Sequence, residues 1–188
     1  MAELFVQIAV SIDGYIEDAN KNIDWMEFDT SYDPVVTATL QSIDGMIFGR
    51  RAHALLHRFW PSAASSEGAS ADLIEQARLM NELPKYVLTH GAETTGWNNS
   101  HAIRIEDLPR LKREARRPLA LFAGAIAAQT AITHGVVDEI RLFQQPVVLG
   151  AGTPLFARDG QRRDLALIES QSFASGAVLS RYTVNART

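Results

Sequence analysis

The apolar residues of this chain fall into short runs whose spacing predicts alternating strands and helices. Residues 4–10 form an almost unbroken apolar run, which is typical of a strand buried on both faces of a sheet. We therefore expect this first strand near the centre of its sheet. Asp33 and Pro34 then begin a helix that extends to about Ile43, because Asp can cap a first turn and Pro is tolerated in it.

The middle of the chain continues the alternation. Apolar residues at helical spacing, such as Leu73, Ala77 and Met80, predict helices, and short apolar runs predict strands. Gly135 ends the last of these helices, since glycine readily takes the left-handed backbone of a C-terminal cap. Residues 61–70, rich in Ser, Ala and Gly, are expected to form a loop. The predicted helices are residues 51–59, 71–82, 105–117 and 124–134, and the predicted strands are residues 45–48, 85–89 and 119–123.

The last third of the chain has a different pattern. Residues 138–144, 164–173 and 178–184 look like strands, and a short turn at residues 173–176 joins the last two. Strands joined by a short turn are antiparallel. The whole pattern predicts an α/β domain with a central mixed sheet, mostly parallel but with an antiparallel C-terminal hairpin, and helices on both faces. A length of 188 residues fits a single domain.

Composition and charge exclude several classes of protein. Hydrophobic residues make up 46% of the chain, which predicts a buried core and excludes a disordered protein. The formal net charge of -4 provides no basic surface for nucleic acid. The absence of cysteine excludes disulfides, thiolate metal sites and a Cys nucleophile, and it agrees with a reducing compartment.

Hydropathy adds an expectation about location. The most apolar stretch, residues 119–132, is far shorter than the ~20 residues of a membrane span, and no targeting segment is visible. We therefore expect a cytoplasmic protein that binds neither membranes nor nucleic acid.

Candidate chemistry lies where predicted strands end. In open α/β sheets, ligands bind at the carboxyl ends of the strands, where helix N-termini offer unpaired N–H groups to anions. In one such segment, Gly49 lets the backbone turn close to a ligand, and Arg50 and Arg51 follow with guanidinium groups that suit a phosphate. Taken alone, this segment is better explained as a tight turn with two solvated arginines.

Two more segments have the same arrangement. Residues 121–127 are a strand that enters a helix through small residues, which would let a diphosphate approach the amides of the first turn. Close packing of the helix on the strand explains the same residues without a ligand. Residues 86–91 end a strand with Thr89, His90 and Gly91, which individually are weak signals of a binding site.

Other motifs fail when their full requirements are considered. Gly150 and Gly152 begin a dinucleotide fingerprint, but Leu155 stands where its third glycine belongs. His53 and His57 are four residues apart on a predicted helix, as zinc ligands can be, yet no third ligand is evident. The chain also has no P-loop and no G-x-S-x-G motif. We therefore predict no metal site, no P-loop enzyme and no serine hydrolase.

Six segments, taken in order, carry a resemblance that none has alone. They are residues 8–16, 44–50, 87–89, 121–125, 135–140 and 146–156. In this order they resemble a reductase family: the C-terminal domain of the riboflavin-biosynthesis deaminase-reductase and its stand-alone relatives, which share the dihydrofolate reductase fold. The resemblance spans residues 4–182 and implies a three-layer fold around a mixed sheet of about eight strands.

The resemblance also implies NADPH as the cofactor. In the family, the Gly-Arg turn after the second strand holds the adenosine 2′-phosphate, and a glycine pair at the later strand-helix turn holds the diphosphate. The second glycine of that pair is Gly124 here, whereas Ala123 replaces the first. The cofactor-binding residues implied are Ala9, Gly49, Arg50, Arg51, Thr89, His90, Ala123, Gly124, Ala125, Ile126 and Ala127.

The reaction implied is hydride transfer from the nicotinamide to an unsaturated carbon of a small heterocycle, followed by protonation. Two carboxylates are candidates for catalysis, because each could hold the heterocycle or relay a proton. Asp13 matches the Ser-x-Asp-Gly motif of the pyrimidine reductases. Asp33 precedes the Gly-Arg turn by the interval found in dihydrofolate reductases, although it is also a natural helix cap. Around the substrate we expect Ser11, Tyr15 and Trp25, together with Phe28.

The identity of the substrate stays open. A riboflavin-pathway reductase, whose substrate is pyrimidine-like, usually carries a basic residue where Tyr15 stands. A dihydrofolate reductase, whose substrate is pteridine-like, usually carries an aromatic residue where Thr37 stands. A different interpretation is a non-catalytic nucleotide-binding or dimeric interaction module on the same fold.

The resemblance further favours a homodimer built partly from the late strands. Residues 146–156 are apolar enough to take part in it. The alternative is that this segment is buried in the core of a monomer.

Overall fold

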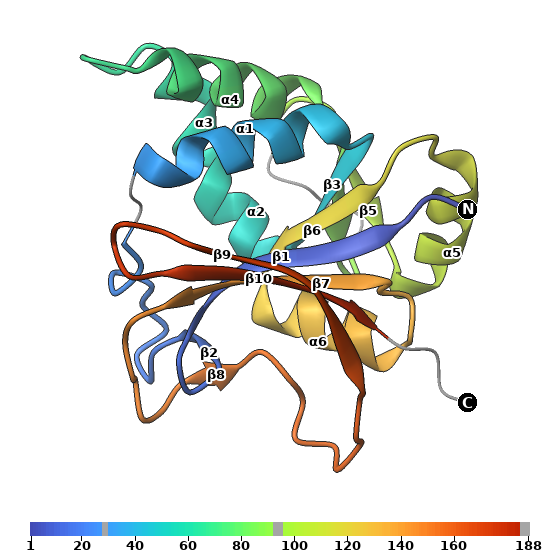
Figure 1. Ribbon diagram of the computed structural model, residues 1–188. Helices are drawn as coiled ribbons and strands as arrows, with labels where there is room; N and C mark the ends of the chain where they lie inside the picture. Colours follow the sequence, from blue (N-terminus) through green and yellow to red (C-terminus); the bar gives the residue numbers. More distant parts are fainter. Residues whose placement is uncertain (28–29, 92–95, 185–188) are drawn as a thin grey trace.

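The computed structural model describes residues 1–27, 30–91 and 96–184, and an eight-stranded mixed sheet forms its centre (Figure 1). The first six strands across the sheet are parallel, and each of the last two is antiparallel to the strand before it. This arrangement confirms the predicted fold class. The strands follow one another in the order β5 (Ser100–Ile103), β4 (Lys85–Leu88), β3 (Gly45–Gly49), β6 (Leu119–Ala123), β1 (Leu4–Ser11), β7 (Glu139–Gln145), β10 (Val178–Val184) and β9 (Leu165–Ser172).

The first strand lies inside the sheet, as its apolar run predicts. β1 is flanked by β6 and β7, and Leu4, Phe5 and Val6 are fully buried. Because alternate side chains of a strand point to opposite faces, both faces of β1 must be covered. Phe5 packs in a core cluster with Leu40 on one face, while Leu4 and Val6 belong to the cluster that contains Ala128 on the other.

Helices cover both faces of the sheet (Figure 1). One face carries η1 (Thr30–Tyr32), α1 (Asp33–Ser42), α2 (Arg50–His57), α3 (Trp60–Ala63) and α4 (Ala71–Glu82). The opposite face carries η2 (Ile105–Asp107), α5 (Leu108–Glu114) and α6 (Ala125–Thr133). None of the helices in the described part of the chain is long and apolar enough to cross a membrane.

A small second sheet lies beside the carboxyl end of β1. It pairs β2 (Tyr15–Glu17) with β8 (Thr153–Pro154) in antiparallel fashion. Gly152 makes this pairing possible, because its φ is +150° and a Cβ there would collide with the carbonyl oxygen of Glu17. The hydrophobic pattern missed both strands, which have only three and two residues.

Other differences from the predicted elements have local causes. β5 was missed because Ser100 and His101 interrupt any apolar run. The helix expected at residues 105–117 ends at Glu114, since the backbone N–H groups of Arg116 and Arg117 donate to Asp44 Oδ2 at 2.7 and 2.8 Å. The loop expected at residues 61–70 is also shorter than predicted. Its first three residues belong to α3, where a proline occupies the first turn.

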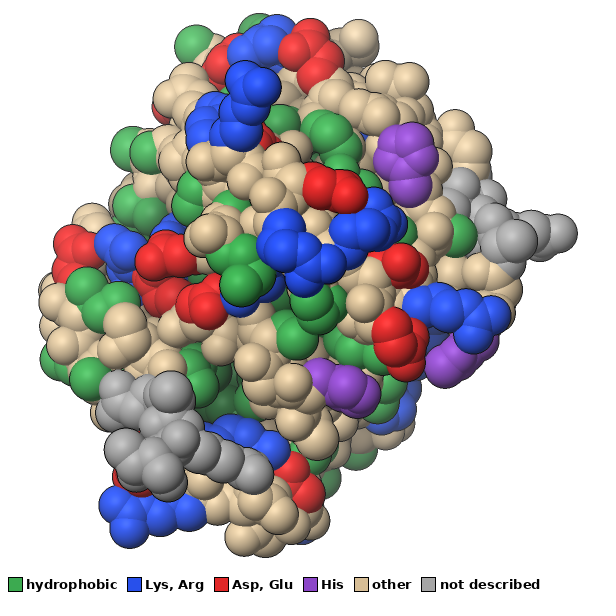
Figure 2. Space-filling view, turned by 90° about the vertical axis from the view of Figure 1, so that its right-hand side faces the viewer, with side chains coloured by type: hydrophobic (Ala, Val, Ile, Leu, Met, Phe, Trp, Pro, Cys, Tyr) green, Lys and Arg blue, Asp and Glu red, His purple; other side chains and the backbone are tan. Residues whose placement is uncertain are grey.

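Charged side chains are paired both at the surface and inside. On the face that carries α5, Figure 2 shows basic and acidic side chains interspersed. Lys112 of α5 is 8% exposed, and its Nζ pairs with Asp138 Oδ2 at 2.5 Å. Deeper in the sheet, Glu139 is 4% exposed and accepts from Arg141 at 2.8 Å and Arg181 at 2.6 Å. Burial raises the pKa of Glu139, but these two arginines outweigh that effect and hold it below its usual value.

Candidate cofactor and substrate site

Two strand-helix turns meet at the carboxyl ends of the neighbouring strands β3 and β6. Gly49 leads from β3 into α2, and Gly124 leads from β6 into α6. Gly124 has a φ of +106°, and a Cβ on it would lie 3.1 Å from both Cα and N of Gly49. The two backbones therefore approach each other more closely than side chains would allow. This contact brings together two segments that the sequence treats as separate signals.

The contact also places two helix N-termini side by side. The first N–H groups of a helix have no partner within it and carry partial positive charge. In α6, the first intrahelical bond runs from Ala128 N to Gly124 O at 2.9 Å, so Ala125, Ile126 and Ala127 supply the unpaired turn. Side chains there are small apart from Ile126, which is 69% exposed. Such a turn can accept a diphosphate against its backbone.

Ala123 fits its position without strain. The positive-φ residues other than glycine in the described part of the chain are Lys21 and Asn99, so Ala123 keeps an ordinary backbone. The unusual conformation falls on Gly124 alone. Replacing the family's first glycine by alanine therefore leaves the cradle between the two turns intact.

The structure separates the two arginines that follow Gly49. Arg50 lines a pocket of about 340 Å³ together with Leu88, Thr89, His90 and Gly91. Thr89 Oγ1 accepts from Gly91 N at 3.1 Å, which holds the turn after β4 closed. The strand ends of β3 and β4 thus bring Arg50, Thr89 and His90 to one pocket.

The charge of Arg51 affects a different residue, Glu17 of β2. Burial raises the pKa of Glu17, but hydrogen bonds from Thr153 and Lys21, with the charges of Lys21 and Arg51, hold it below its usual value. Neither Arg50 nor Arg51 forms an ion pair with any described carboxylate. Both guanidinium groups can therefore take an anionic ligand.

The end of β1 carries the residues expected near the substrate. Ala9 packs against the cluster of Phe143 and Tyr32, on the face covered by α1. Ser11 is fully buried; its Oγ donates to Asp13 Oδ1 at 2.7 Å and accepts from Tyr15 N at 2.9 Å. The hydroxyl of Ser11 thus shapes the turn that presents Asp13.

Asp13 fastens a distant loop to that turn. Its carboxylate accepts from Leu149 N at 3.1 Å and from Gly150 N at 2.7 Å. The hydrogen bond from Ser11 lowers the pKa of Asp13; some loss of hydration opposes this effect, and the two backbone amides lower the pKa further. An ionised, triply engaged carboxylate suits a positioning role better than that of a proton donor.

Asp33 lies apart from Asp13. It begins α1, and its Oδ1 accepts from Gln76 Nε2 of α4 at 3.1 Å. The same amide donates to Thr37 Oγ1 at 3.1 Å, so Asp33 takes part in the contact between the two helices. The two predicted catalytic carboxylates do not share a hydrogen-bond network in the described structure. Their catalytic roles stay predictions.

The predicted aromatic residues have different surroundings. Tyr15 Oη accepts from Arg158 Nη2 at 3.4 Å, so a basic group lies beside the position that lacks one in the sequence. Trp25 is half-buried, and its Nε1 is buried without a partner within the described residues. Phe28 lies outside the described residues.

The histidine pair of α2 serves packing. His53 is 1% exposed and its Nε2 lies 2.9 Å from Ser100 Oγ. Burial, helped by the charges of His57 and Lys85, lowers the pKa of His53 to about 4. The ring of His57 stacks on Trp97 at 5.9 Å. Within residues 1–27, 30–91 and 96–184, no cluster of three His, Asp or Glu side chains could hold a metal ion.

Comparison with known proteins places this arrangement in a family. Residues 2–179 match the family described as the RibD C-terminal domain. The chain belongs to this family. A similar protein is the uncharacterized protein YyaP of Bacillus subtilis (strain 168), which is 32% identical over 187 residues, or 97% of this chain and 95% of YyaP.

Solved structures support the fold of this RibD C-terminal domain. A putative riboflavin biosynthesis protein from Shewanella sp. PV-4 aligns over 99% of this chain and 100% of its own, with a TM-score of 0.72 and 21% identity. Dihydrofolate reductase from Enterococcus faecalis, complexed with NADP(H), aligns over 98% and 97%, with a TM-score of 0.63 and 12% identity. The resemblance seen in the sequence and the dihydrofolate reductase-like fold are both confirmed.

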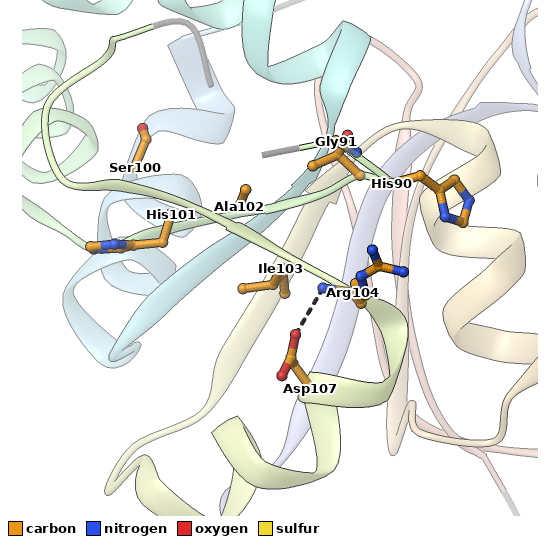
Figure 3. Close-up of a pocket in the computed structure, with 9 residues that line it drawn as sticks. His90, Gly91, Ser100, His101, Ala102, Ile103, Arg104 and Asp107 are labelled. Atoms are coloured by element: carbon orange, nitrogen blue, oxygen red, sulfur yellow. Dashed lines mark hydrogen bonds between the residues drawn. The ribbon is translucent and has the colours of Figure 1, made fainter. Parts of the chain in front are cut away.

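One cation of this RibD C-terminal domain escaped the sequence analysis. Arg104 follows β5 and lines a hollow of about 640 Å³ that shares Thr89, His90 and Gly91 with the pocket of Arg50. Figure 3 shows Arg104 and His90 at the ends of adjoining strands, with Arg104 N donating to Asp107 Oδ2 at 2.9 Å. Arg104 was not identified as a site residue because the sequence pattern did not predict β5, whose carboxyl end it follows. The signal available was an Arg directly before a predicted helix start.

Proposed function

We propose that the protein is an NADPH-dependent reductase that transfers hydride to a small heterocyclic substrate, either pyrimidine-like or pteridine-like. The observation that carries this proposal is the contact of Gly49 with Gly124. It sets two helix N-termini against each other at the carboxyl ends of adjacent parallel strands, where a dinucleotide diphosphate can meet several unpaired N–H groups.

Cations flank this cradle on the side of β4 and β5. Arg50 and Arg104 line adjoining hollows and have no ion-pair partner among the described carboxylates. A guanidinium group donates two hydrogen bonds to a phosphate at once, so we assign both residues to the adenosine 2′-phosphate. We assign Thr89 and His90 to the same end of the cofactor, and Arg51 to the side that faces Glu17.

Exposed apolar side chains follow the carboxyl ends of β1, β6 and β7. Ile12, Ile126 and Val148 are large apolar side chains with 56%, 69% and 66% exposure, and Ile12 N donates to Val147 O at 2.8 Å. A nicotinamide held there would supply the hydride, and these side chains would help to shield it from water. Asp13 holds the loop of Val148 in place, so the position of that side chain depends on the Asp13 carboxylate.

Parallel titrations with NADPH and NADH, followed by tryptophan fluorescence, test the proposal. The wild type should prefer NADPH, and the double variant Arg50→Ala, Arg104→Ala should lose that preference because it lacks both guanidinium groups assigned to the 2′-phosphate. Arg113→Ala is the matched control, since Arg113 is exposed on α5 and forms no ion pair with a described residue. A preference for NADPH that survives the double substitution refutes the phosphate assignment.

Turnover separates this proposal from a non-catalytic module. A reductase should oxidise NADPH when it is given a dihydropterin or an aminopyrimidinedione. If NADPH binds tightly and no such compound oxidises it, the module is the better explanation.

We also propose a cytoplasmic homodimer in which a second copy covers the edge strand β9. Leu167 and Ile168 of β9 are 59% and 49% exposed, and one edge of this strand has no partner strand in the described sheet. The segment 146–156 is only partly buried, since Val148 is exposed and Leu155 is 1% exposed. Light scattering should give a dimer mass for the wild type and a monomer mass for Leu167→Lys; a monomeric wild type contradicts the proposal.

A further inference from the structure

One buried polar atom at the end of β7 has no hydrogen-bond partner. Gln145 is 3% exposed, and its Oε1 is unpaired within the described part of the chain. Nearly all buried acceptors in folded proteins are paired, because an unpaired one retains the cost of leaving water. The unpaired oxygen therefore marks a position where a donor from a ligand would be stabilising.

Gln145 lies at the substrate end of the sheet. It is paired in register with Ser11, as Phe143 is with Ala9. Paired residues of parallel strands direct their side chains to the same face, so Gln145 shares the face of Ala9 and Phe143. Tyr32 covers that face at the start of α1. The carboxamide of Gln145 is thus the last side chain of β7 on this face, next to the turn that contains Asp13.

A second unpaired buried atom belongs to the segment after β2. Met26 of this segment packs in the core cluster on the α6 face, whereas Gln145 shares the α1 face. Trp25 precedes Met26 and holds an unpaired, buried donor, Nε1. The third unpaired buried atom in the described residues, Trp60 Nε1, belongs to α3.

The predicted carboxylates already have partners. Asp13 accepts from Ser11, Leu149 and Gly150, and Asp33 Oδ1 accepts from Gln76. Gln145 Oε1 is the one buried side-chain acceptor left unpaired in residues 1–27, 30–91 and 96–184. A heterocycle placed at this edge would therefore find its acceptor on β7.

We infer that Gln145 is a specificity-determining residue whose Oε1 accepts a hydrogen bond from a ring N–H of the substrate. The inference rests on the proposed function, because it names the group of the heterocycle that the protein recognises.

The test compares two probes that differ in ring N–H groups, 5,6-diaminouracil and 5,6-diamino-1,3-dimethyluracil. Calorimetric titrations with and without NADPH give both affinities. The wild type should bind the first probe about tenfold more tightly than the second, which corresponds to one lost hydrogen bond. Gln145→Met should bind the two probes equally, since it keeps the volume of the side chain and removes the acceptor.

Two further variants make the result specific. Gln144→Met, on the opposite face of β7, should keep the wild-type ratio of affinities. Gln145→Glu keeps an acceptor at the same length and should keep the preference for the N–H probe. Gln145→Met should also melt no lower than the wild type, because it removes an unpaired buried acceptor.

The outcomes separate this inference from the proposed function. It is overturned if Gln145→Met keeps the tenfold ratio, or if the wild type binds neither probe. A protein that binds NADPH but shows an unchanged ratio loses only the role of Gln145. A protein that fails to bind NADPH but whose probe ratio depends on Gln145 loses only the proposed cofactor.

Discussion

The contact between the two glycine turns makes Gly124→Ala the most informative substitution in this protein. Gly124 has a φ of +106°, which L side chains rarely adopt, and a new Cβ would lie 3.1 Å from Cα and N of Gly49. The substitution therefore strains the backbone at Gly124 and forces the β3–α2 and β6–α6 turns apart by a few tenths of an ångström.

The size of the effect follows from these two terms. A non-glycine residue in such a conformation costs about 1–3 kcal/mol, and we expect about 2–3 kcal/mol once the contact with Gly49 is included. In a protein of this size each kcal/mol lowers the melting temperature by roughly 2–4 °C, so the drop should be roughly 4–12 °C. Displaced amides would also lose a charge-assisted hydrogen bond, which lowers NADPH affinity about tenfold or more.

Gly135→Ala is the matched control. Gly135 also has a positive φ, +66°, but it lies at the other end of α6 and a Cβ there would meet nothing within 4 Å. It should therefore cost about 1–2 kcal/mol from backbone strain alone and leave NADPH binding unchanged. Thermal melting and calorimetric titration with NADPH on both variants measure the two effects.

Two outcomes would refute this reasoning. Wild-type affinity for NADPH in Gly124→Ala would show that the contact of the turns is not part of the cofactor site. An equal loss of affinity in Gly135→Ala would show that the effect comes from general destabilisation of α6.

Two further predictions concern buried and engaged carboxylates. Glu139→Gln removes the counter-charge of Arg141 and one of the two carboxylates that pair with Arg181, the other being Glu169, and should cost about 2–3 kcal/mol at pH 7 in urea unfolding. Because the pKa of Glu139 is lowered in the folded protein, its contribution to the free energy of unfolding is complete above the ordinary value of 4.5 and is lost as the pH falls below it. A difference in unfolding free energy between variant and wild type that stays constant down to pH 3 contradicts the role of Glu139 in these ion pairs. Asp13→Asn should weaken the hydrogen bonds from the backbone N–H groups of Leu149 and Gly150 and speed hydrogen exchange at both amides about tenfold. Unchanged exchange rates would show that Asp13 does not position this loop.

Much of the fold could be predicted because its signals are local. The unbroken apolar run of β1 predicts burial on both faces, and the structure places that strand between β6 and β7. β5 gives no such signal, since Ile103 is its buried apolar residue and its neighbours are polar or small. β2 and β8 form only where Gly152 lets two distant backbones meet. β2 and β8 therefore form because of a tertiary contact, and the hydrophobic periodicity of the sequence does not predict them.

The candidate site divides in the same way. The sequence indicates a turn at Gly49 and another at Gly124. Their contact depends on β3 and β6 being neighbours in the sheet, which no local sequence pattern predicts. The partners of Asp13 lie 136 and 137 residues away, so its role in fastening the loop could not be read from its own motif. The unpaired atom of Gln145 is likewise a property of packing.

The fastening of that loop has a mechanical consequence for the whole site. Asp13 ties the turn after β1 to Gly150; two residues later Gly152 lies against Glu17, and Pro154 O accepts from Gln129 Nε2 of α6 at 2.6 Å. These links form a continuous brace from the turn at the substrate end to the helix whose first turn faces Gly49. A ligand that steadies α6 also restricts the motion of the turn after β1. We therefore expect the two ends of the site to fill cooperatively, each ligand lowering the entropy cost of ordering that the other must meet.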